Sequence, residues 1–432
     1  MAESYFLINL FIIRIMRFFL TFLISLSGFC QFYGQAVQET ASPNYIRTIS
    51  FTGENTENPG NPIILLGGTL QLSFDDIIGD EADYYYTVEH YNFDWTPSQL
   101  SKNEYMDGFD DLRITNYTNA YNTLQPYTHY ELSIPNNRTK ALKVSGNYLL
   151  KIFNANRELV FSRKFMVYEN FAQVSAQVKR SRDLEFINEK QVVNFSINSP
   201  DFILKNPENN VRVLLMQNYN LKSAILDLKP QYTIASELIY KYDAESAFWG
   251  GNEFLQFDDK DLRATTADIA SVELDELYHH YLYTDRTRNG NPYTYNPDLN
   301  GGFVVRSYPA ENSDIEAEYV WVHFQLKNYD PIGKSQLHLY GGFNNFQLDE
   351  STQLRYNEET GYYECARLFK QGYYNYKYVL LDENGQLDEG FISGNFDETE
   401  NTYTILAYYH APGARYDRLI GVGSANSKNI TN

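Results

Sequence analysis

The sequence predicts an all-β protein made of tandem immunoglobulin-like or early-set β-sandwich domains that follow a cleaved signal peptide. Short segments in which apolar and polar residues alternate recur along the chain, separated by clusters of Gly, Pro, Asn and Asp. This pattern is typical of strands joined by turns. The chain also holds 38 Tyr and 28 Phe, residue types that favour half-buried strand faces. Helical periodicity is weak throughout, and residues 268–278 are the best helix candidate.

The N-terminus carries the features of a secretory leader. Arg14 and Arg17 precede the apolar run 18–29, and small residues follow it. The run is about as long as the hydrophobic region of a signal peptide and too short to span a bilayer. We therefore predict a signal peptide over residues 1–36, with Met16 as an alternative start, and an exported protein.

Cysteine content and charge narrow the class of protein further. Removal of the leader leaves Cys365 as the one cysteine, so the exported chain has no internal disulfide and depends on its hydrophobic cores for stability. The formal net charge is −20, which repels phosphate backbones and anionic lipid headgroups. Beyond the leader, no run approaches the roughly 20 apolar residues of a membrane helix. We expect neither nucleic-acid binding nor direct membrane insertion.

The first domain is predicted over residues 44–169. Its clearest strands are residues 46–51, 70–74 and 84–93, and the segment closes with a hairpin formed by residues 146–153 and 159–167. About seven short strands in such a length fit one β-sandwich.

Two further domains are predicted, over residues 170–326 and 327–423. The second holds the stretch 248–253 and an irregular tract rich in Pro, Asn and Gly over residues 284–298, and long loops of this kind often carry function. The third has the strand and turn order of early-set sandwiches. The polar tail 424–432 is predicted to be disordered.

No constellation of catalytic residues stands out. The chain lacks a nucleotide-binding glycine loop and a Gly-x-Ser-x-Gly elbow. The adjacent His279 and His280 would face opposite sides of a strand and not share one metal ion. The acidic clusters lack the spacing of a calcium loop, and Cys365 is interpreted as a small core residue. We predict no catalytic residue, no metal site and no cofactor, although a glycosidase with an unrecognised carboxylate pair stays open.

The candidate contact residues lie in aromatic, glycine-containing stretches. They are Phe248, Trp249, Gly250, Gly251, Asn252 and Glu253, together with Tyr293, Tyr295 and Trp95. Large aromatic side chains beside a glycine turn form either an exposed recognition surface or the packed core of a domain. The sequence leaves both interpretations open.

Several of these stretches belong to a set of aromatic-rich runs that identifies a family resemblance. The runs are DEADYYY (80–86), HYNFDWTPSQL (90–100), FSRKF (161–165), KRSR (179–182), FWGGNE (248–253), HHYLY (279–283) and PYTYNPD (292–298). Together they resemble the plug proteins of the type IX secretion system of Bacteroidetes, which serves protein secretion and gliding motility. The runs span the first two predicted domains, whereas the third has less distinctive motifs.

The resemblance implies a periplasmic protein that lies against the inner face of the outer membrane. There it would bind the periplasmic opening of the giant outer-membrane translocon β-barrel and close it when no cargo is exported. Such a role involves no reaction, no cofactor and no small-molecule substrate. The aromatic residues above, Phe248, Trp249, Tyr293 and Tyr295 first among them, are the candidate contacts with the barrel.

A second function from a different class is a carbohydrate-binding or cell-surface adhesion protein. It is favoured by the tandem sandwiches and by the similarity of the third predicted domain to glycogen- and starch-binding modules. Those modules stack sugars on exposed tryptophans, whereas the corresponding turn here reads GFNNF (342–346). Because fold does not determine function, the sugar site need not accompany the fold.

Overall fold

The computed structural model describes residues 36–53, 62–308, 310–428 and 430. All elements below belong to the compact unit Gln38–Asn432. The predicted signal peptide lies outside the described residues except for Ala36. None of the helices in the described part of the chain has the length and apolar content needed to span a bilayer.

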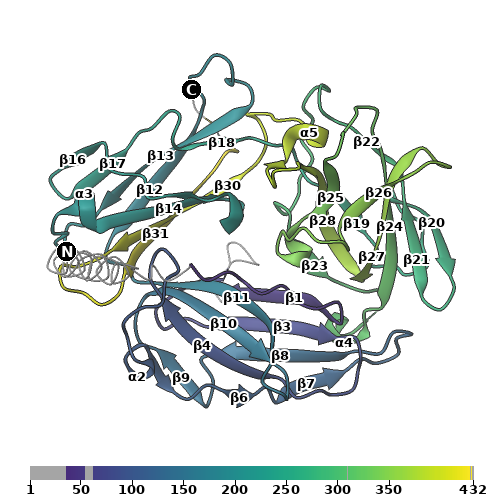
Figure 1. Ribbon diagram of the computed structural model, residues 1–432, viewed down its shortest axis with the longest axis horizontal. Helices are drawn as coiled ribbons and strands as arrows, with labels where there is room; N and C mark the ends of the chain where they lie inside the picture. The colour runs from purple at the N-terminus through teal and green to yellow at the C-terminus, as the bar shows by residue number, and fades with distance from the viewer. Residues whose placement is uncertain (1–35, 54–61, 309, 429, 431–432) are drawn as a thin grey trace, which may run out of the picture. The chain divides into compact units, whose positions relative to one another are not determined.

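Two antiparallel-dominated sheets form the first sandwich (Figure 1). One sheet has the order β1 (Ile46–Gly53), β3 (Leu70–Asp76), β8 (Thr128–Ile134) and β7 (Asn116–Asn119). The other has the order β2 (Ile63–Leu65), β11 (Leu159–Tyr168), β10 (Gly146–Phe153), β4 (Tyr85–Tyr91) and β6 (Leu112–Arg113). A short ribbon of β5 (Met106–Gly108) and β9 (Thr139–Leu142) follows α2 (Lys102–Tyr105). The predicted hairpin is confirmed, because β10 and β11 pair antiparallel.

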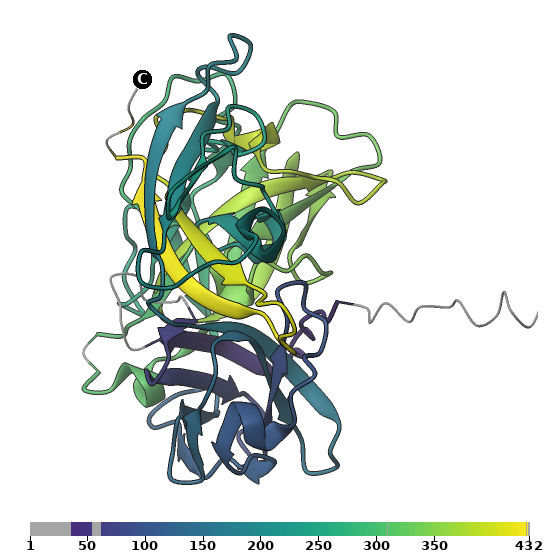
Figure 2. The ribbon, with the colours of Figure 1, turned by 90° about the vertical axis from the view of Figure 1, so that its left-hand side faces the viewer.

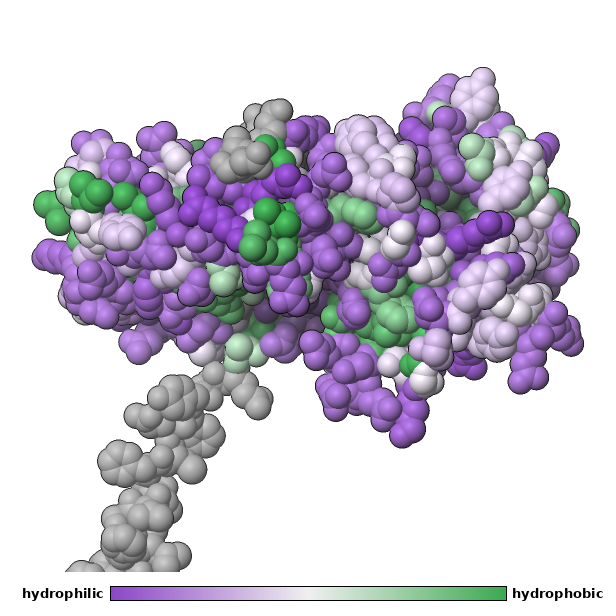
Figure 3. All heavy atoms as spheres, turned by 90° about the horizontal axis from the view of Figure 1, so that it is seen from above, coloured by the Kyte–Doolittle hydropathy of each residue, from purple (hydrophilic) through white to green (hydrophobic). Residues whose placement is uncertain are grey.

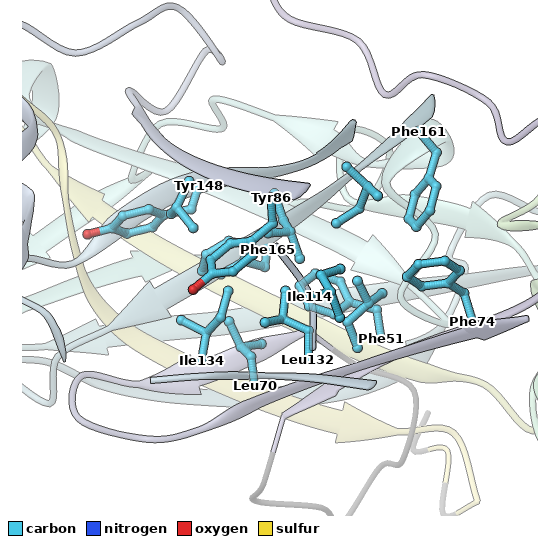
Figure 4. Close-up of a cluster of buried hydrophobic side chains, with 14 of the residues drawn as sticks. Phe51, Leu70, Phe74, Tyr86, Ile114, Leu132, Ile134, Tyr148, Phe161 and Phe165 are labelled. Atoms are coloured by element: carbon cyan, nitrogen blue, oxygen red, sulfur yellow. The ribbon is translucent and has the colours of Figure 1, made fainter. Parts of the chain in front are cut away.

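Aromatic rings fill the space between these sheets (Figure 4). Phe74 of one sheet meets Phe161 of the other edge to face, with centroids 5.3 Å apart. Tyr148 stacks on Phe165 at 5.1 Å and donates its hydroxyl hydrogen to the Val144 carbonyl. Such rings stabilise the fold through the apolar area that they bury and through favourable edge-to-face or stacked contacts, provided that each buried hydroxyl finds an acceptor. The abundance of Tyr and Phe is therefore largely a property of the core.

A second sandwich combines strands that lie far apart in the sequence. One sheet has the order β12 (Gln173–Arg180), β13 (Lys190–Asn198), β17 (Glu237–Tyr240) and β16 (Tyr232–Ile234), with β18 (Ala247–Trp249) also pairing with β13. The other has the order β15 (Ile225–Leu226), β14 (Val211–Gln217), β30 (Thr402–Tyr409) and β31 (Arg418–Asn426). The short helices α3 (Pro207–Asn210) and η1 (Leu221–Ser223) connect strands. One hydrophobic cluster, with Phe195, Tyr240, Phe248, Tyr403 and Ile405 among its members, joins the two sheets.

The third sandwich is a single eleven-stranded sheet in the described residues. Its main path runs β19 (Leu255–Asp258), β28 (Gly372–Leu381), β25 (Gln336–Tyr340), β26 (Gln353–Asn357), β27 (Tyr362–Lys370), β24 (Tyr319–Lys327), β21 (Tyr278–Leu282) and β20 (Ile269–Leu274). The strands β22 (Asp285–Arg286), β23 (Phe303–Val305) and β29 (Leu387–Asp388) pair off this path, and α4 (Ser313–Glu316), η2 (Gly342–Asn344) and α5 (Gly390–Ser393) lie between strands. Phe257 at one end of the path packs against Phe324 near the other. The sheet therefore folds over on itself.

Strand pairing does not follow the predicted boundary between residues 326 and 327. The C-terminal strands β30 and β31 lie beside strands of the second sandwich in Figures 1 and 2, and β30 pairs with β14 over seven residues, from Val211 opposite Tyr409 to Gln217 opposite Tyr403. The third sandwich occupies the sequence between β18 and β30. We propose that the second domain is discontinuous and that the third is inserted into it.

Two local predictions are wrong. Residues 268–278 form β20 and the start of β21 instead of a helix, because β20 pairs antiparallel with β21 and this pairing overrides weak local propensity. The tail was expected to be disordered from residue 424. Ser424, Ala425 and Asn426 instead pair with β30, and the buried hydroxyl of Ser427 bonds to the carbonyl of Thr399.

A buried carboxylate connects the first and third sandwiches. Asp75 of β3 accepts hydrogen bonds from Lys370 Nζ at 2.7 Å, from the Tyr319 hydroxyl at 2.7 Å and from His129 Nδ1 at 2.6 Å. Burial alone would raise the pKa of Asp75, but the interactions with Lys370 and His129 outweigh it and hold this pKa below its usual value. The carboxylate is therefore ionised and is partnered by three side chains.

We expect Lys370→Met to lower the free energy of unfolding by about 3–5 kcal/mol, because it leaves a buried charge without its counter-ion. Urea denaturation measures the loss. The matched control Lys334→Met removes an exposed ion pair with Glu383 and should change stability by less than about 0.5 kcal/mol. Because the pKa of Asp75 is lower in the folded state, its contribution is present above about pH 4 and is lost as the pH falls further. Equal losses in both variants would contradict this account.

Candidate functional site

Two chain segments connect the second and third sandwiches, and they lie side by side. Residues 249–254 lead from β18 to β19, and residues 394–401 lead back from α5 to β30. We call these two segments the joint. The Gly251 carbonyl accepts hydrogen bonds from Phe396 N at 2.8 Å and from the Thr399 hydroxyl at 2.9 Å. The Gly250 carbonyl accepts one from Asn401 Nδ2 at 2.8 Å. The predicted stretch 248–253 thus forms half of a crossing between sandwiches.

The two glycines of the joint are needed for different reasons. A Cβ at Gly250 would lie 2.0 Å from the Phe396 carbonyl oxygen, so a side chain there would push the crossing segments apart. Gly251 has φ +66° and open space where its Cβ would stand. Gly250 is therefore required because two backbones approach closely there, and Gly251 is favoured because its backbone has a positive φ.

Glu253 is the buried acceptor of the joint, at 1% exposure. Its Oε1 accepts hydrogen bonds from the Tyr293 hydroxyl at 2.5 Å and from Glu400 N at 3.0 Å. Its Oε2 has no partner among the described residues, and burial raises the pKa of this carboxyl. Asn252 beside it donates to the Ser393 carbonyl at 2.7 Å. Both side chains are buried and serve internal hydrogen bonds.

The irregular tract 284–298 closes over the joint through its aromatic and acidic side chains. The Tyr295 hydroxyl donates to Glu400 Oε2 at 2.9 Å, and Asp298 accepts from Phe254 N at 2.5 Å and from Asn300 N at 2.6 Å. Burial, together with the nearby carboxylates of Glu253 and Glu400, raises the pKa of Asp298 to about 7 against the effect of those hydrogen bonds. The two stretches that the sequence singled out are therefore brought together.

Phe248 is a core residue, so its expected role as an exposed contact is corrected. It is 7% exposed and lies 5.3 Å from the Tyr403 ring in the core of the second sandwich. Trp249 is 46% exposed, because successive residues of β18 face opposite sides of the sheet. Phe186 contacts the Trp249 ring edge to face at 5.3 Å, and Lys190 Nζ lies 4.2 Å from its centroid.

Trp95 is likewise buried, whereas Tyr295 is exposed. Trp95 packs beside Tyr91, and Lys164 Nζ lies 4.3 Å from its ring centroid. Tyr295 is 55% exposed, and Tyr293 is half-buried beside Phe396. Of the predicted aromatic contacts, Trp249 and Tyr295 therefore present the most surface. Figure 3 shows one face on which hydrophobic residues form separate groups in a mostly hydrophilic surface.

Sequence reasoning missed the residues of the joint that come from residues 394–401. Glu400 lies 147 residues beyond Glu253 in the sequence. No local sequence pattern marks Phe396 or Glu400 as neighbours of the 248–253 stretch. A strand-pairing signal between β30 and β14 would have placed them, because that pairing brings the segment back to the second sandwich.

The residues considered for chemistry have structural partners. His279 Nδ1 lies 2.8 Å from His323 Nε2, whereas His280 Nε2 bonds to the Leu262 carbonyl at 3.0 Å. The two adjacent histidines therefore have different partners. Burial raises the pKa of the Cys365 thiol to about 11, which keeps it protonated at neutral pH. Within the described ranges, no group of three or more His, Cys, Asp or Glu is arranged to hold a metal ion.

Comparisons with known proteins connect the first sandwich to one family. Residues 46–169 match the family model described as "Type 9 secretion system plug protein 1st domain". A search of curated proteins found no match to this chain.

Among solved structures, the chain is similar along most of its length to a hypothetical protein from Parabacteroides merdae ATCC 43184. The two are 32% identical with a TM-score of 0.85, and the match covers 90% of this chain and 98% of the other. Three N-terminal domains of the outer capsid protein of bacteriophage RB49 align over 90% of this chain and 97% of theirs, at 9% identity and a TM-score of 0.14. The collagen adhesin of S. aureus aligns over 90% and 97%, at 9% identity and a TM-score of 0.10. The last two TM-scores are too low to indicate a shared fold.

Gly250→Ala should destabilise the joint by about 3 kcal/mol, at the upper end of the usual cost of overpacking, because its Cβ meets a backbone oxygen. Gly251→Ala is the matched control, and it should cost about 1 kcal/mol through its left-handed backbone alone. Thermal unfolding and limited proteolysis between residues 394 and 401 measure the difference. Equal behaviour of the two variants would show that the close approach at Gly250 does not hold the segments together.

The melting temperature should rise as the pH falls from 8 to 6. The folded-state pKa of Asp298, about 7, is above its unfolded value near 4, so the folded state binds more protons between these values and stability decreases as the pH rises through them. Asp298→Asn should flatten this part of the profile. A profile unchanged by the substitution would assign the pH dependence to other groups.

Proposed function

Because this chain belongs to the family of type 9 secretion system plug proteins, we propose that it is a non-enzymatic periplasmic plug. It binds the periplasmic opening of the outer-membrane translocon β-barrel and closes that opening when no cargo is exported. The match of the first sandwich to the family model is the observation that carries this proposal. The family suggests a periplasmic location and implies association with the type IX secretion machinery, and it is not an enzyme family.

The internal contacts fit a protein that acts by its shape. The first sandwich is bonded to the third through Asp75, and to the second through Asp417, which accepts from Phe93 N at 2.9 Å. The Tyr408 hydroxyl donates to Asn147 Oδ1 at 2.6 Å in the same contact. A body held by buried hydrogen bonds loses little conformational freedom on docking, which favours binding to a wide opening.

We propose that Trp249 and Tyr295 contribute to the surface that contacts the barrel. Both combine an exposed apolar ring with a fixed position, since Trp249 packs on Phe186 and Tyr295 bonds to Glu400. Rigid aromatic side chains give contact area at a low entropy cost and are enriched at interfaces.

The double variant Trp249→Ala, Tyr295→Ala should retain its melting temperature and reduce co-purification with the barrel by roughly tenfold or more, since each aromatic anchor contributes about 1–2 kcal/mol. The measurement is recovery of the barrel by the tagged protein from detergent-solubilised outer membranes. Tyr329→Ala with Tyr356→Ala is the matched control, because those rings of the third sandwich are 80% and 54% exposed.

Two outcomes of this experiment would count against the proposal. Equal recovery by both double variants would remove Trp249 and Tyr295 from the contact surface. Failure of the unmodified protein to recover any large barrel, together with retention on immobilised glucans, would favour the carbohydrate-binding function instead.

A further inference from the structure

A cavity of about 460 Å³ lies where the three sandwiches meet. Its lining includes Arg47 and Arg163 from the first sandwich, Lys222 from the second and Arg367 from the third. Sites for small molecules typically have volumes of this order and occur where domains meet. The cavity is separate from the joint, with which it shares no residue.

The lining is cationic although the protein is acidic. Among its residues are six with cationic side chains (Arg47, Arg163, Lys164, Lys222, Arg367 and Lys370) and two with carboxylates (Glu39 and Asp298). The whole chain, by contrast, has a net charge of −20. Two of the cations have other partners, because Lys370 pairs with Asp75 and the Lys164 ammonium lies over Trp95. Four cations therefore remain for the cavity.

These four side chains lack ionic partners in the part of the chain that the structure describes. None of them forms an ion pair within 4.0 Å, and Arg47 Nε is buried without a hydrogen-bond acceptor. Arg163 is 7% exposed and donates through Nη1 to the Ser162 carbonyl. Lys222 Nζ donates to the Phe346 carbonyl at 2.5 Å. Arg367 donates through Nη1 to the Ser351 hydroxyl, and its guanidinium lies 5.4 Å from the centroid of the Phe343 ring. Buried cations are normally paired.

The nearby carboxylates compensate this charge only in part. Glu39 accepts hydrogen bonds from two amide donors, Lys164 N and Asn345 Nδ2, both at 2.6 Å. Burial, with repulsion from Arg47, lowers the pKa of Arg367 to about 10, although Asp349 opposes this. Burial also lowers the pKa of Lys222, and Arg163 adds to that effect. The cations are thus close enough to repel one another.

We propose that the cavity binds a small anion that carries two or more carboxylate or phosphate groups. Arg163, Lys222 and Arg367 are its proposed ligands, and Arg47 Nε supplies a further donor. Guanidinium groups match carboxylate and phosphate oxygens in geometry as well as charge. Because these side chains come from three sandwiches, one anion bound among them cancels their repulsion and fixes the sandwiches relative to one another.

Purified full-length protein tests this inference without the barrel, so failure here and failure of the plug function are distinguishable. Citrate and pyrophosphate are added separately, each against sodium chloride at equal ionic strength. Either anion at about 100 times its Kd should raise the melting temperature by roughly 4 °C or more, with binding confirmed by calorimetry. A response to citrate alone supports a carboxylate ligand, and a response to pyrophosphate alone supports a phosphate ligand.

Lys222→Gln is the main test variant, because Lys222 lies on the short helix η1 and, among the described residues, its ammonium donates to the Phe346 carbonyl without an ionic partner. It should weaken binding at least tenfold, as should Arg367→Gln. Lys334→Gln, at an exposed ion pair with Glu383, is the matched control and should leave binding unchanged. No shift beyond that of sodium chloride, or a shift retained in both cavity variants, would overturn the inference.

Discussion

The arrangement of the sandwiches depends on one fully buried carboxylate, Asp75. Its three donors come from β8, β24 and β27, so the carboxylate is satisfied only when the first and third sandwiches are in register. A buried charge that loses its partners costs several kcal/mol, whereas small shifts of an apolar contact cost far less. Tyr319 reinforces this register, because its hydroxyl also lies 2.6 Å from Thr48 Oγ1. The ion pair and hydrogen bonds of Asp75 therefore fix the first sandwich relative to the third more precisely than apolar packing alone would.

The family runs recognised in the sequence lie mostly at contacts between segments distant in the chain. Arg163 of FSRKF lines the cavity, and Arg180 of KRSR pairs with Asp397, Nη2 to Oδ1 3.1 Å. The run FWGGNE forms half of the joint, and Asp298 ends the tract that closes over it. What these runs have in common is that their residues contact segments that are distant in the chain.

Local strand character could be predicted from sequence, and strand partners could not. The hairpin of β10 and β11 is visible in the residues themselves, because two apolar runs flank a short turn. The pairing of β30 with β14 joins residues that are separated by nearly half the chain, and no feature of residues 402–409 identifies β14 as their partner. The same limit applies at the site. The sequence identifies Phe248 and Trp249 as a pair, but only the pairing of β18 with β13 decides which ring is buried. Glu400, at the far side of the joint, carries no local signal at all.

The proposed insertion of the third sandwich within the second has a consequence for the order of folding. Strands β1 to β11 of the first sandwich are contiguous in the sequence, so this sandwich can fold as a unit before the C-terminal strands are available. The second sandwich lacks β30 and β31 until the last strands have been made. During that interval β14 lacks its hydrogen-bonded neighbour β30 and presents an unpaired edge, the kind of surface on which chaperones act. The folding protein is thus most vulnerable to aggregation before β30 pairs with β14.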